Sequence, residues 1–409
     1  MQDETGSRLS SYRWVIVSLL FFATLINYYD RVVLSVVIPS LKKELAITDI
    51  QYSYVLSFFQ FGYMFGSLLA GKMIDHIGVK LGYWLSIFFW SVAAAMHSTV
   101  RSAFSLAGWR GFLGLSEGGN FPAAIKAISE WFPPHERALS TSLFNSGPHI
   151  AMITGAPIIA FLTLSFGWRW AFLAMGLAGI VLAAVWPFLY RTPPHSDAAG
   201  RSKSVPWRFL LRDRAVWGLM IARFVSDPVW WFYIFWLPAY LNSQRGLDLK
   251  EIGFAIPLVY LFAILMGNTV GWFSGRLINR GWDPIRTRKT LMSACAACMP
   301  FTAFAVAADS LTATILLVGL ACGAHTGWSA NLFPLITDRF PTGAVASVTG
   351  ITTFAASIGG LLLSTVLVGY IVTYLGYTPI FVLMGVLHPV AAAIIVLFVR
   401  RKEPESAEA

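Results

Sequence analysis

Seven ionisable side chains interrupt long apolar stretches of this sequence. They are Asp30, Arg31, Arg110, Glu117, Lys126, Arg223 and Asp227. The stretches are long enough to cross a bilayer, and a charge at the bilayer centre costs at least about 2.5–3.5 kcal/mol on insertion scales. Such groups must therefore pair with one another or line a cavity, and they are typical of substrate paths and proton relays.

Four of these residues predict a site that binds an anion and carries protons. Arg31 and Tyr28 are three residues apart and share a helix face, and a guanidinium with a tyrosine hydroxyl suits a carboxylate. Arg110 and Glu117 lie seven apart on one face, about 10 Å apart along the axis, which is too far to pair directly. We expect Asp30 to be the acid that meets Arg110. Because burial favours the neutral form of a carboxyl, Glu117 is our first candidate for the proton carrier and Asp30 the second.

Each assignment has a structural alternative. Arg31 could snorkel to the outer surface, and the buried acids could form static salt bridges between helices. Arg223 and Asp227 are four residues apart, so we expect them to pair on one helix face, and their role stays open. We expect Lys126, near the end of its apolar stretch, to snorkel towards the surface.

Neutral polar and aromatic side chains complete the candidate substrate site. Sugars present C–H faces that pack on aromatic rings, and amides, hydroxyls and imidazoles hydrogen-bond to sugar hydroxyls. Trp is also common at bilayer interfaces, hydroxyls bond back within their own helix, and a lone His is more often packed than functional. Beside Arg31 and Tyr28, the candidates are Gln60, Tyr63, His149, Trp231, Tyr233, Trp328, Asn331 and Thr353.

The elements that position these residues are apolar helices. The chain has 409 residues, of which 56% are hydrophobic and 12% charged, whereas a soluble domain carries about a quarter charged residues. Fitting spans of about 20 apolar residues end to end predicts twelve. They are 14–38, 51–71, 81–100, 103–127, 138–163, 167–190, 215–241, 251–274, 287–307, 310–334, 344–369 and 375–399.

The distribution of basic residues predicts the topology. If the N-terminus is cytoplasmic, cytoplasmic segments hold 20 of the 30 Lys and Arg and outer segments hold 6. This bias follows the positive-inside rule and places both termini in the cytoplasm. The net charge of +10 is therefore a topology signal, and we expect no nucleic-acid partner. The compact loops favour the inner membrane of a bacterium, and we expect a monomer.

The chain divides into two similar halves. The polar stretch 191–214 predicts a cytoplasmic linker between six-helix bundles at 1–190 and 215–409. A Gly71-x-x-x-Asp75-x-x-Gly78 loop follows the second span, and Gly271-Trp-Phe-Ser-Gly275 follows the eighth. Phe-Pro at 132–133 and at 340–341 repeats at nearly the same offset. A duplicated unit of this kind is typical of transporters.

These motifs resemble the major facilitator superfamily over essentially the whole chain. The loop from Gly71 through Asp75 to Gly78 matches the commonest signature of that superfamily, and the resemblance implies a latch between the halves. The second copy has Gly275 in place of the acid, which predicts an asymmetric latch. Within the superfamily the chain resembles the anion:cation symporter family. The matching segments are Asn27-Tyr-Tyr-Asp-Arg31, Arg110-Gly-Phe-Leu-Gly-Leu-Ser-Glu117, Glu130-Trp-Phe-Pro-Pro-His-Glu-Arg137 and 223–238.

The resemblance implies an all-α membrane transporter that imports a small organic anion, with a hexuronate or related sugar acid expected, by proton symport and alternating access. It implies protonatable acids at Asp30 and Glu117. A proton-coupled exporter of amphiphilic compounds is disfavoured by Arg31 and Arg110, a uniporter of neutral sugars needs no buried acid, and short loops leave a receptor little surface. We expect no enzyme activity, no metal and no cofactor beyond the coupling proton, since no Walker A sequence or zinc-ligand spacing occurs.

Overall fold

The computed structural model describes residues 2–47, 49–193, 205–247 and 249–400, and all regular structure in these ranges is helical. The first half contains α1 (Gln2–Leu45), α2 (Asp49–Ile77), α3 (Val79–Met96), η1 (His97–Thr99), α4 (Ala103–Glu117), α5 (Asn120–Trp131), α6 (Pro134–Phe166) and α7 (Trp168–Leu189). The second half contains α9 (Trp207–Leu210), α10 (Arg214–Arg245), α11 (Leu249–Asn279), α12 (Pro284–Cys298), η2 (Met299–Ala305), α13 (Leu311–Arg339), α14 (Thr342–Gly359), η3 (Gly360–Val366), α15 (Leu367–Leu375) and α16 (Thr378–Phe398).

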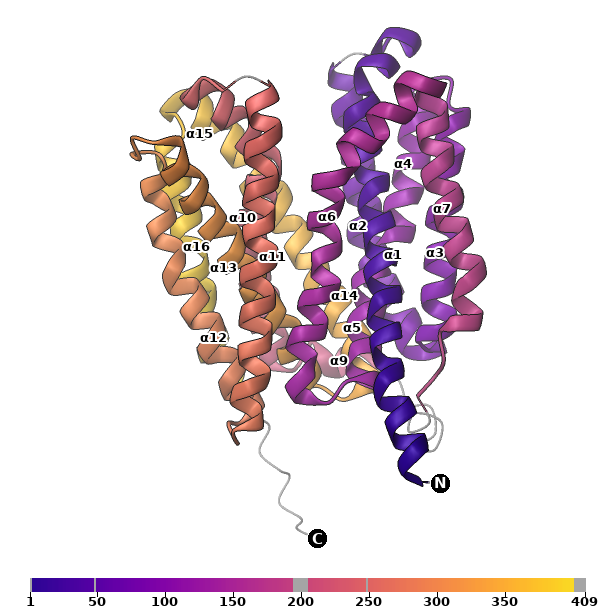
Figure 1. Ribbon diagram of the computed structural model, residues 1–409, viewed down its shortest axis with the longest axis vertical. Coiled ribbons are helices and arrows are strands. Elements are labelled where there is room, and N and C mark those ends of the chain that lie inside the picture. The colour runs from indigo at the N-terminus through magenta and orange to yellow at the C-terminus, as the bar shows by residue number, and fades with distance from the viewer. Residues whose placement is uncertain (1, 48, 194–204, 248, 401–409) are drawn as a thin grey trace.

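The helices form two groups that stand side by side, α1 to α7 and α10 to α16 (Figure 1). The start of α1 and the end of α16 lie at the same end of the molecule, which we call the terminal end. Of the predicted linker 191–214, residues 194–204 lie outside the described residues. The rest includes α9 and Asp213, whose side chain caps α10 by accepting a hydrogen bond from the amide of Ala215.

Nine helical stretches of the described chain are long and apolar enough to cross a membrane. They correspond to nine of the predicted spans, so the protein is a multi-pass helical membrane protein, and the count of twelve stays a prediction. The three remaining predicted spans are also helical. Span 215–241 lies within α10, span 287–307 passes from α12 into the 3-10 turn η2, and span 103–127 is divided between α4 and α5.

Close packing accounts for the break between α4 and α5. Gly118 and Gly119 separate the two helices, and a Cβ atom on Gly118 would lie 2.2 Å from the backbone nitrogen of Ser67 in α2. A glycine pair therefore lets the chain lie against a neighbouring backbone here, and both glycines keep right-handed helical backbone angles. The break leaves Glu117 as the last residue of α4, in the middle of the bundle.

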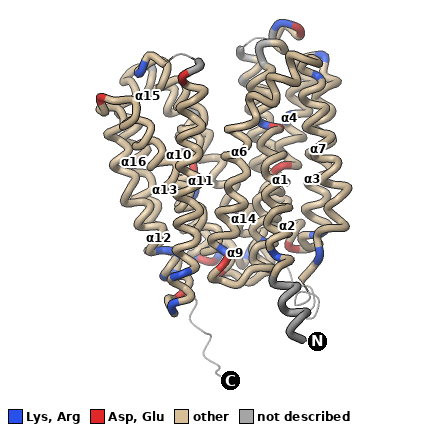
Figure 2. Tube along the Cα trace, viewed as in Figure 1, with Lys and Arg blue, Asp and Glu red and all other residues tan. Residues whose placement is uncertain are grey.

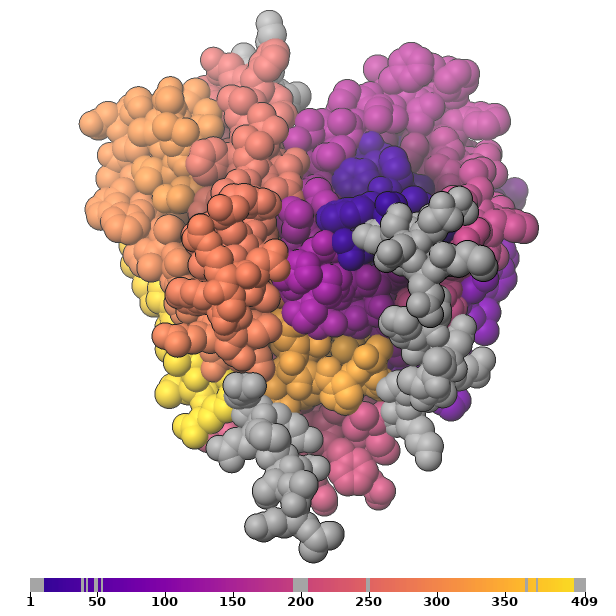
Figure 3. All heavy atoms as spheres, turned by 60° about the horizontal axis from the view of Figure 1, so that its bottom comes forward, coloured from indigo at the N-terminus to yellow at the C-terminus, as the bar shows by residue number. Residues whose placement is uncertain are grey.

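Charged residues gather at the two ends of the helices, and few lie at mid-height (Figure 2). Viewed obliquely from the terminal end, the two halves are in contact, with α14 lying beneath the helices of the first half (Figure 3). Helix α14 packs along α2, and α11 packs along α6. These two pairs of helices join the halves and enclose the interior from the terminal side.

The contact between α2 and α4 predicts a sharp difference between two glycines of α4. A Cβ on Gly114 would lie 2.2 Å from the carbonyl oxygen of Phe59, whereas a Cβ on Gly108 meets nothing within 4 Å. Overpacking costs about 1–3 kcal/mol. We expect Gly114→Val to lower the melting temperature of the detergent-solubilised protein by several degrees and Gly108→Val to leave it nearly unchanged. Equal melting temperatures for the two variants would contradict this packing.

Candidate functional site

Arg31 and Glu117 form a buried ion pair between α1 and α4. Arg31 Nε lies 2.8 Å from Glu117 Oε2, and the glutamate side chain is fully buried. The guanidinium carbon lies 4.6–4.7 Å from the ring centroids of Tyr28 and Tyr63. Three helices thus converge on one guanidinium, and the alternative that Arg31 snorkels to the surface is wrong. Its partner in this state of the molecule is Glu117, which the sequence did not predict.

Asp30 and Arg110 meet, but not through the aspartate carboxylate. Arg110 Nη1 donates to the backbone carbonyl oxygen of Asp30 at 3.1 Å. Neither carboxylate oxygen of Asp30, nor Oε1 of Glu117, has a hydrogen-bond partner among the described residues, although all three are buried. The expected pairing of Asp30 with Arg110 therefore needs correction, because the guanidinium reaches the main chain of α1. The site holds two cations and two acids whose acceptor capacity is only partly used.

A cavity of about 80 Å³ lies next to this cluster, between the two halves. Six of the predicted substrate residues line it, namely Tyr28, Tyr63, His149, Trp231, Trp328 and Thr353. Residues from α1, α2, α5 and α6 face others from α10, α13 and α14. The cavity therefore lies at the boundary across which two rigid halves could move, where transporters of this architecture hold their substrates.

Four predicted substrate residues do not line this cavity. Arg31 lies behind Tyr28 and Tyr63, and Gln60 is half-buried elsewhere on α2. Tyr233 packs in the core of the second half against Phe232 and Phe381. Asn331 accepts a hydrogen bond from Ser274 Oγ at 2.7 Å and holds α13 to α11. The roles predicted for Gln60, Tyr233 and Asn331 in direct contact with a substrate are not supported by their positions.

The cavity also contains residues outside the predicted set. Two histidines and a tryptophan form a ring cluster, since Trp230 stacks on His325 at 5.7 Å and meets His149 edge-on at 4.9 Å. His149 Nε2 also lies 3.3 Å from Thr326 Oγ1. Further lining residues are Phe121, Asn145, Pro148, Arg223, Asp227, Ser329, Leu332, Phe333, Ala356 and Ser357. Helical spacing could have found several of them, because 326, 329 and 333 continue one face of α13.

The motif from Gly71 to Gly78 forms the end of α2 and the turn into α3, and it contacts the second half at the place where a latch is predicted. Asp75 accepts hydrogen bonds from the backbone nitrogens of Ala346 and Ser347 in α14, at 3.2 and 2.6 Å. A Cβ on Gly71 would lie 2.5 Å from the carbonyl oxygen of Ala346, and Gly78 has φ +87°. Gly71 permits the close approach of α14, and Asp75 accepts hydrogen bonds near the positive N-terminal end of α14. Gly78 forms the turn that follows α2.

Lys126 is part of this latch, so the prediction that it snorkels is wrong. Its Nζ lies 2.9 Å from Asp75 Oδ1, and its side chain is buried. The reason is that α5 packs against α2, so the ammonium group reaches Asp75 and the carbonyl oxygen of Ile74 in α2. The pair neutralises an aspartate that would otherwise carry an uncompensated charge between the halves.

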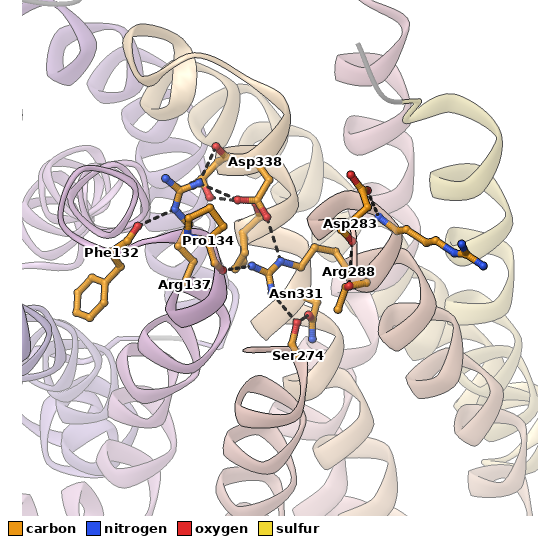
Figure 4. Close-up of polar contacts among 12 residues, drawn as sticks. Phe132, Pro134, Arg137, Ser274, Asp283, Arg288, Asn331 and Asp338 are labelled. Carbon is orange, nitrogen blue, oxygen red and sulfur yellow. Dashed lines mark hydrogen bonds and ion pairs between the residues drawn. The ribbon is translucent and has the colours of Figure 1, made fainter. Parts of the chain in front are cut away.

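A second charged network joins the halves near the repeated motif (Figure 4). Asp338 of α13 bridges Arg137 of α6 at 2.7 Å and Arg288 of α12 at 3.1 Å. Arg288 also donates to the carbonyl oxygen of Pro134 in the first half. At Gly275, a Cβ would lie 2.1 Å from the carbonyl oxygen of His135. The second copy of the motif thus makes a close backbone contact without an acid, and Asp338 of α13 forms a separate ion pair with Arg137 across the boundary.

Comparisons with known proteins agree with this architecture. Residues 20–364 match the sequence family described as the Major Facilitator Superfamily. Relatives include a probable L-galactonate transporter of Escherichia coli, 30% identical over 87% of this chain and 82% of that protein, and a hexuronate transporter of the same organism, 28% identical over 95% and 94%. A probable galactarate/D-glucarate transporter of Bacillus subtilis is 29% identical over 91% and 88%.

A solved structure shares the fold. The proton:xylose symporter bound to 6-bromo-6-deoxy-D-glucose superposes with a TM-score of 0.78 over 96% of each chain, at 15% sequence identity. At this identity the likeness extends to the arrangement of helices and not to the residues of the site.

The latch predicts a local effect of Asp75→Asn. The amide side chain cannot neutralise Lys126, and it weakens the hydrogen bonds from Ala346 and Ser347, since bonds to a charged group are worth about 1.5–3 kcal/mol. We expect backbone amides near residues 346–347 to exchange with deuterium roughly tenfold faster or more in this variant. Glu44→Gln, which breaks the exposed pair of Glu44 with Arg169, is the control. Unchanged protection at 346–347 would contradict the latch.

Proposed function

This chain belongs to the Major Facilitator Superfamily, and we propose that it imports a sugar acid, a hexuronate or a related acid, into a bacterial cell together with protons. The relatives named above are a hexuronate transporter, a probable L-galactonate transporter and a probable galactarate/D-glucarate transporter, at 28–30% identity over most of the chain, which supports a sugar acid as the substrate. The observation that carries the proposal is the cluster of Arg31, Glu117, Asp30 and Arg110 beside the central cavity.

The acids of this cluster are suited to carry protons. Burying a carboxylate oxygen without a hydrogen-bond donor is costly, and both oxygens of Asp30 and one of Glu117 are in this position. A proton on either acid would relieve that cost, and a change of access from one side to the other would let the proton leave. In this account Glu117 is the first proton carrier, and Asp30 is the second.

Competition for Arg31 would couple the proton to the substrate. Arg31 is held by Glu117, and its guanidinium lies against Tyr28 and Tyr63, which line the cavity. When Glu117 takes up a proton its hold on Arg31 weakens, and the guanidinium becomes available to a substrate carboxylate that enters between the two tyrosines. An anion is therefore bound best when a proton is bound, which is the condition for symport.

Alternating access would use the two charged contacts at the terminal end. The latch at Asp75 and the network at Asp338 hold α14 and α13 of the second half against the first half. Their release would open the cavity to the terminal side, which the charge distribution predicts to be the cytoplasm. A uniporter of neutral sugars would need none of the four charges in the cluster, and for that reason we favour the anion symporter.

Uptake into proteoliposomes tests this function. We expect labelled galacturonate or glucuronate to accumulate under an inward proton gradient, with inhibition by unlabelled sugar acids and not by neutral hexoses. In Glu117→Gln, gradient-driven accumulation should fall at least about tenfold, while exchange of labelled for unlabelled substrate persists, because the neutral side chain cannot carry a proton but still releases Arg31.

Glu136→Gln is the matched control. Glu136 also pairs with an arginine of α1, Arg13 at 2.7 Å, but it lies at the terminal end of α6, away from the cavity. This variant should accumulate substrate as the unsubstituted protein does. Gradient-driven accumulation by Glu117→Gln at the unsubstituted level would remove the proton role, and failure of every sugar acid to enter would remove the proposed function.

A further inference from the structure

Arg223 and Asp227 form an ion pair in the wall of the central cavity that the proposed function does not use. Arg223 Nε and Nη2 both donate to Asp227 Oδ2, at 3.1 and 2.7 Å. Arg223 Nη1 donates to Thr353 Oγ1 at 2.8 Å, and the guanidinium lies over the ring of Phe333 at 5.0 Å. The arginine is thus fixed by contacts to three helices, and it holds Asp227 in one orientation.

The pair presents an acceptor to the cavity. Asp227 keeps 17% of its side-chain surface exposed, against 7% for Arg223. Its Oδ1 accepts a long hydrogen bond, 3.2 Å, from Ser226 Oγ of its own helix. A carboxylate oxygen has two lone pairs, so Oδ1 can take a further donor from the cavity. Arg223 already donates four hydrogen bonds to Asp227, Thr352 and Thr353. The pair therefore presents the cavity mainly with a carboxylate acceptor, which suits a hydroxyl donor better than an anion.

The charges of the residues that line the cavity also favour a hydroxyl group over an anion at this position. Among the described residues that line the cavity, Arg223 is the one Lys or Arg and Asp227 the one acid. Their charges cancel, and the neighbouring Trp230, Trp231 and Thr353 carry none. A substrate hydroxyl that meets Asp227 gains a charge-assisted hydrogen bond. A carboxylate in the same place meets a like charge, and repulsion of this kind is an effective device for rejecting a wrong ligand.

We propose that Asp227, held by Arg223, is the subsite for sugar hydroxyls and restricts transport to sugar acids with a single carboxylate. The inference rests on the proposed function, in which the one carboxylate goes to Arg31. The opposite end of the substrate then lies against α10, with its hydroxyls on Asp227 and its C–H faces near the tryptophans. A diacid, such as the galactarate that a relative is named for, would place its second carboxylate against Asp227.

The test compares monoacids with diacids as inhibitors. Uptake of labelled galacturonate is measured in proteoliposomes against unlabelled galacturonate, glucuronate and galactonate, and against galactarate and glucarate. For the unsubstituted protein we expect the half-inhibitory concentration of the diacids to exceed that of the best monoacid by about tenfold or more, the ratio that 1.4 kcal/mol of discrimination gives.

Asp227→Asn should reverse this preference. The variant leaves Arg223 without its compensating charge, and a guanidinium binds a carboxylate through two parallel hydrogen bonds. We expect diacids to gain at least about fivefold relative to monoacids in this variant. Asp227→Glu, which keeps the charge, should retain the preference for monoacids, and so should Glu44→Gln, which breaks an exposed Arg–carboxylate pair.

Two results would overturn the inference and leave the proposed function standing. One is equal inhibition of the unsubstituted protein by monoacids and diacids, and the other is an unchanged ratio in a folded Asp227→Asn. If Asp227→Asn does not fold, the ratio in the unsubstituted protein decides together with that of Asp227→Glu. Absence of uptake of every sugar acid would overturn both the inference and the proposed function.

Discussion

The structure depends on the cost of placing charges inside an apolar protein that spans a membrane. Each buried cation at mid-height meets an oxygen, and most of these oxygens belong to another helix. Arg31 of α1 meets Glu117 of α4, and Arg110 of α4 meets the main chain of α1. Because removing one partner of such a pair leaves an uncompensated charge that costs about 3–5 kcal/mol, these contacts fix how the first-half helices pack. The same contacts leave carboxylate oxygens without donors, and those oxygens are the groups that can exchange protons.

The two halves divide the chemistry between them. The first half carries the cations and acids that would bind a carboxylate and a proton, and the second half carries aromatic rings, hydroxyls and a neutral ion pair. Between them, both the latch at Asp75 and the bridge at Asp338 use a carboxylate. Asp75 accepts from main-chain amides across the boundary and pairs with Lys126 of its own half, and Asp338 pairs with Arg137 across the boundary and with Arg288 of its own half. Both contacts lie at the terminal end, so the charges that would bind substrate and those that would hold the halves together occupy different levels of one interface.

Much of this arrangement is readable in the sequence. Hydropathy identified apolar stretches that are helical in the structure. The resemblance of the segment from Gly71 to Gly78 to a family signature predicted a contact between the halves, and Asp75 does meet α14. Partners were harder to predict. Helical spacing says which residues of one helix share a face, as it did for Arg223 and Asp227, but it does not say which helix lies opposite. For this reason Glu117 was not recognised as the partner of Arg31, and Lys126 was expected at the surface. Tyr233 and Asn331 were misplaced because a polar or aromatic side chain in a span can face a neighbouring helix as readily as a cavity.

The most direct test of the account follows the proton itself. Proteoliposomes with no imposed gradient contain a pH-sensitive dye, and galacturonate is added outside while a labelled sample records its entry. The account predicts that the interior becomes acidic as the sugar acid enters, that glucose has no such effect, and that protein-free liposomes show neither response. Entry of the labelled acid with no change of internal pH would contradict the claim that sugar acid and protons cross together.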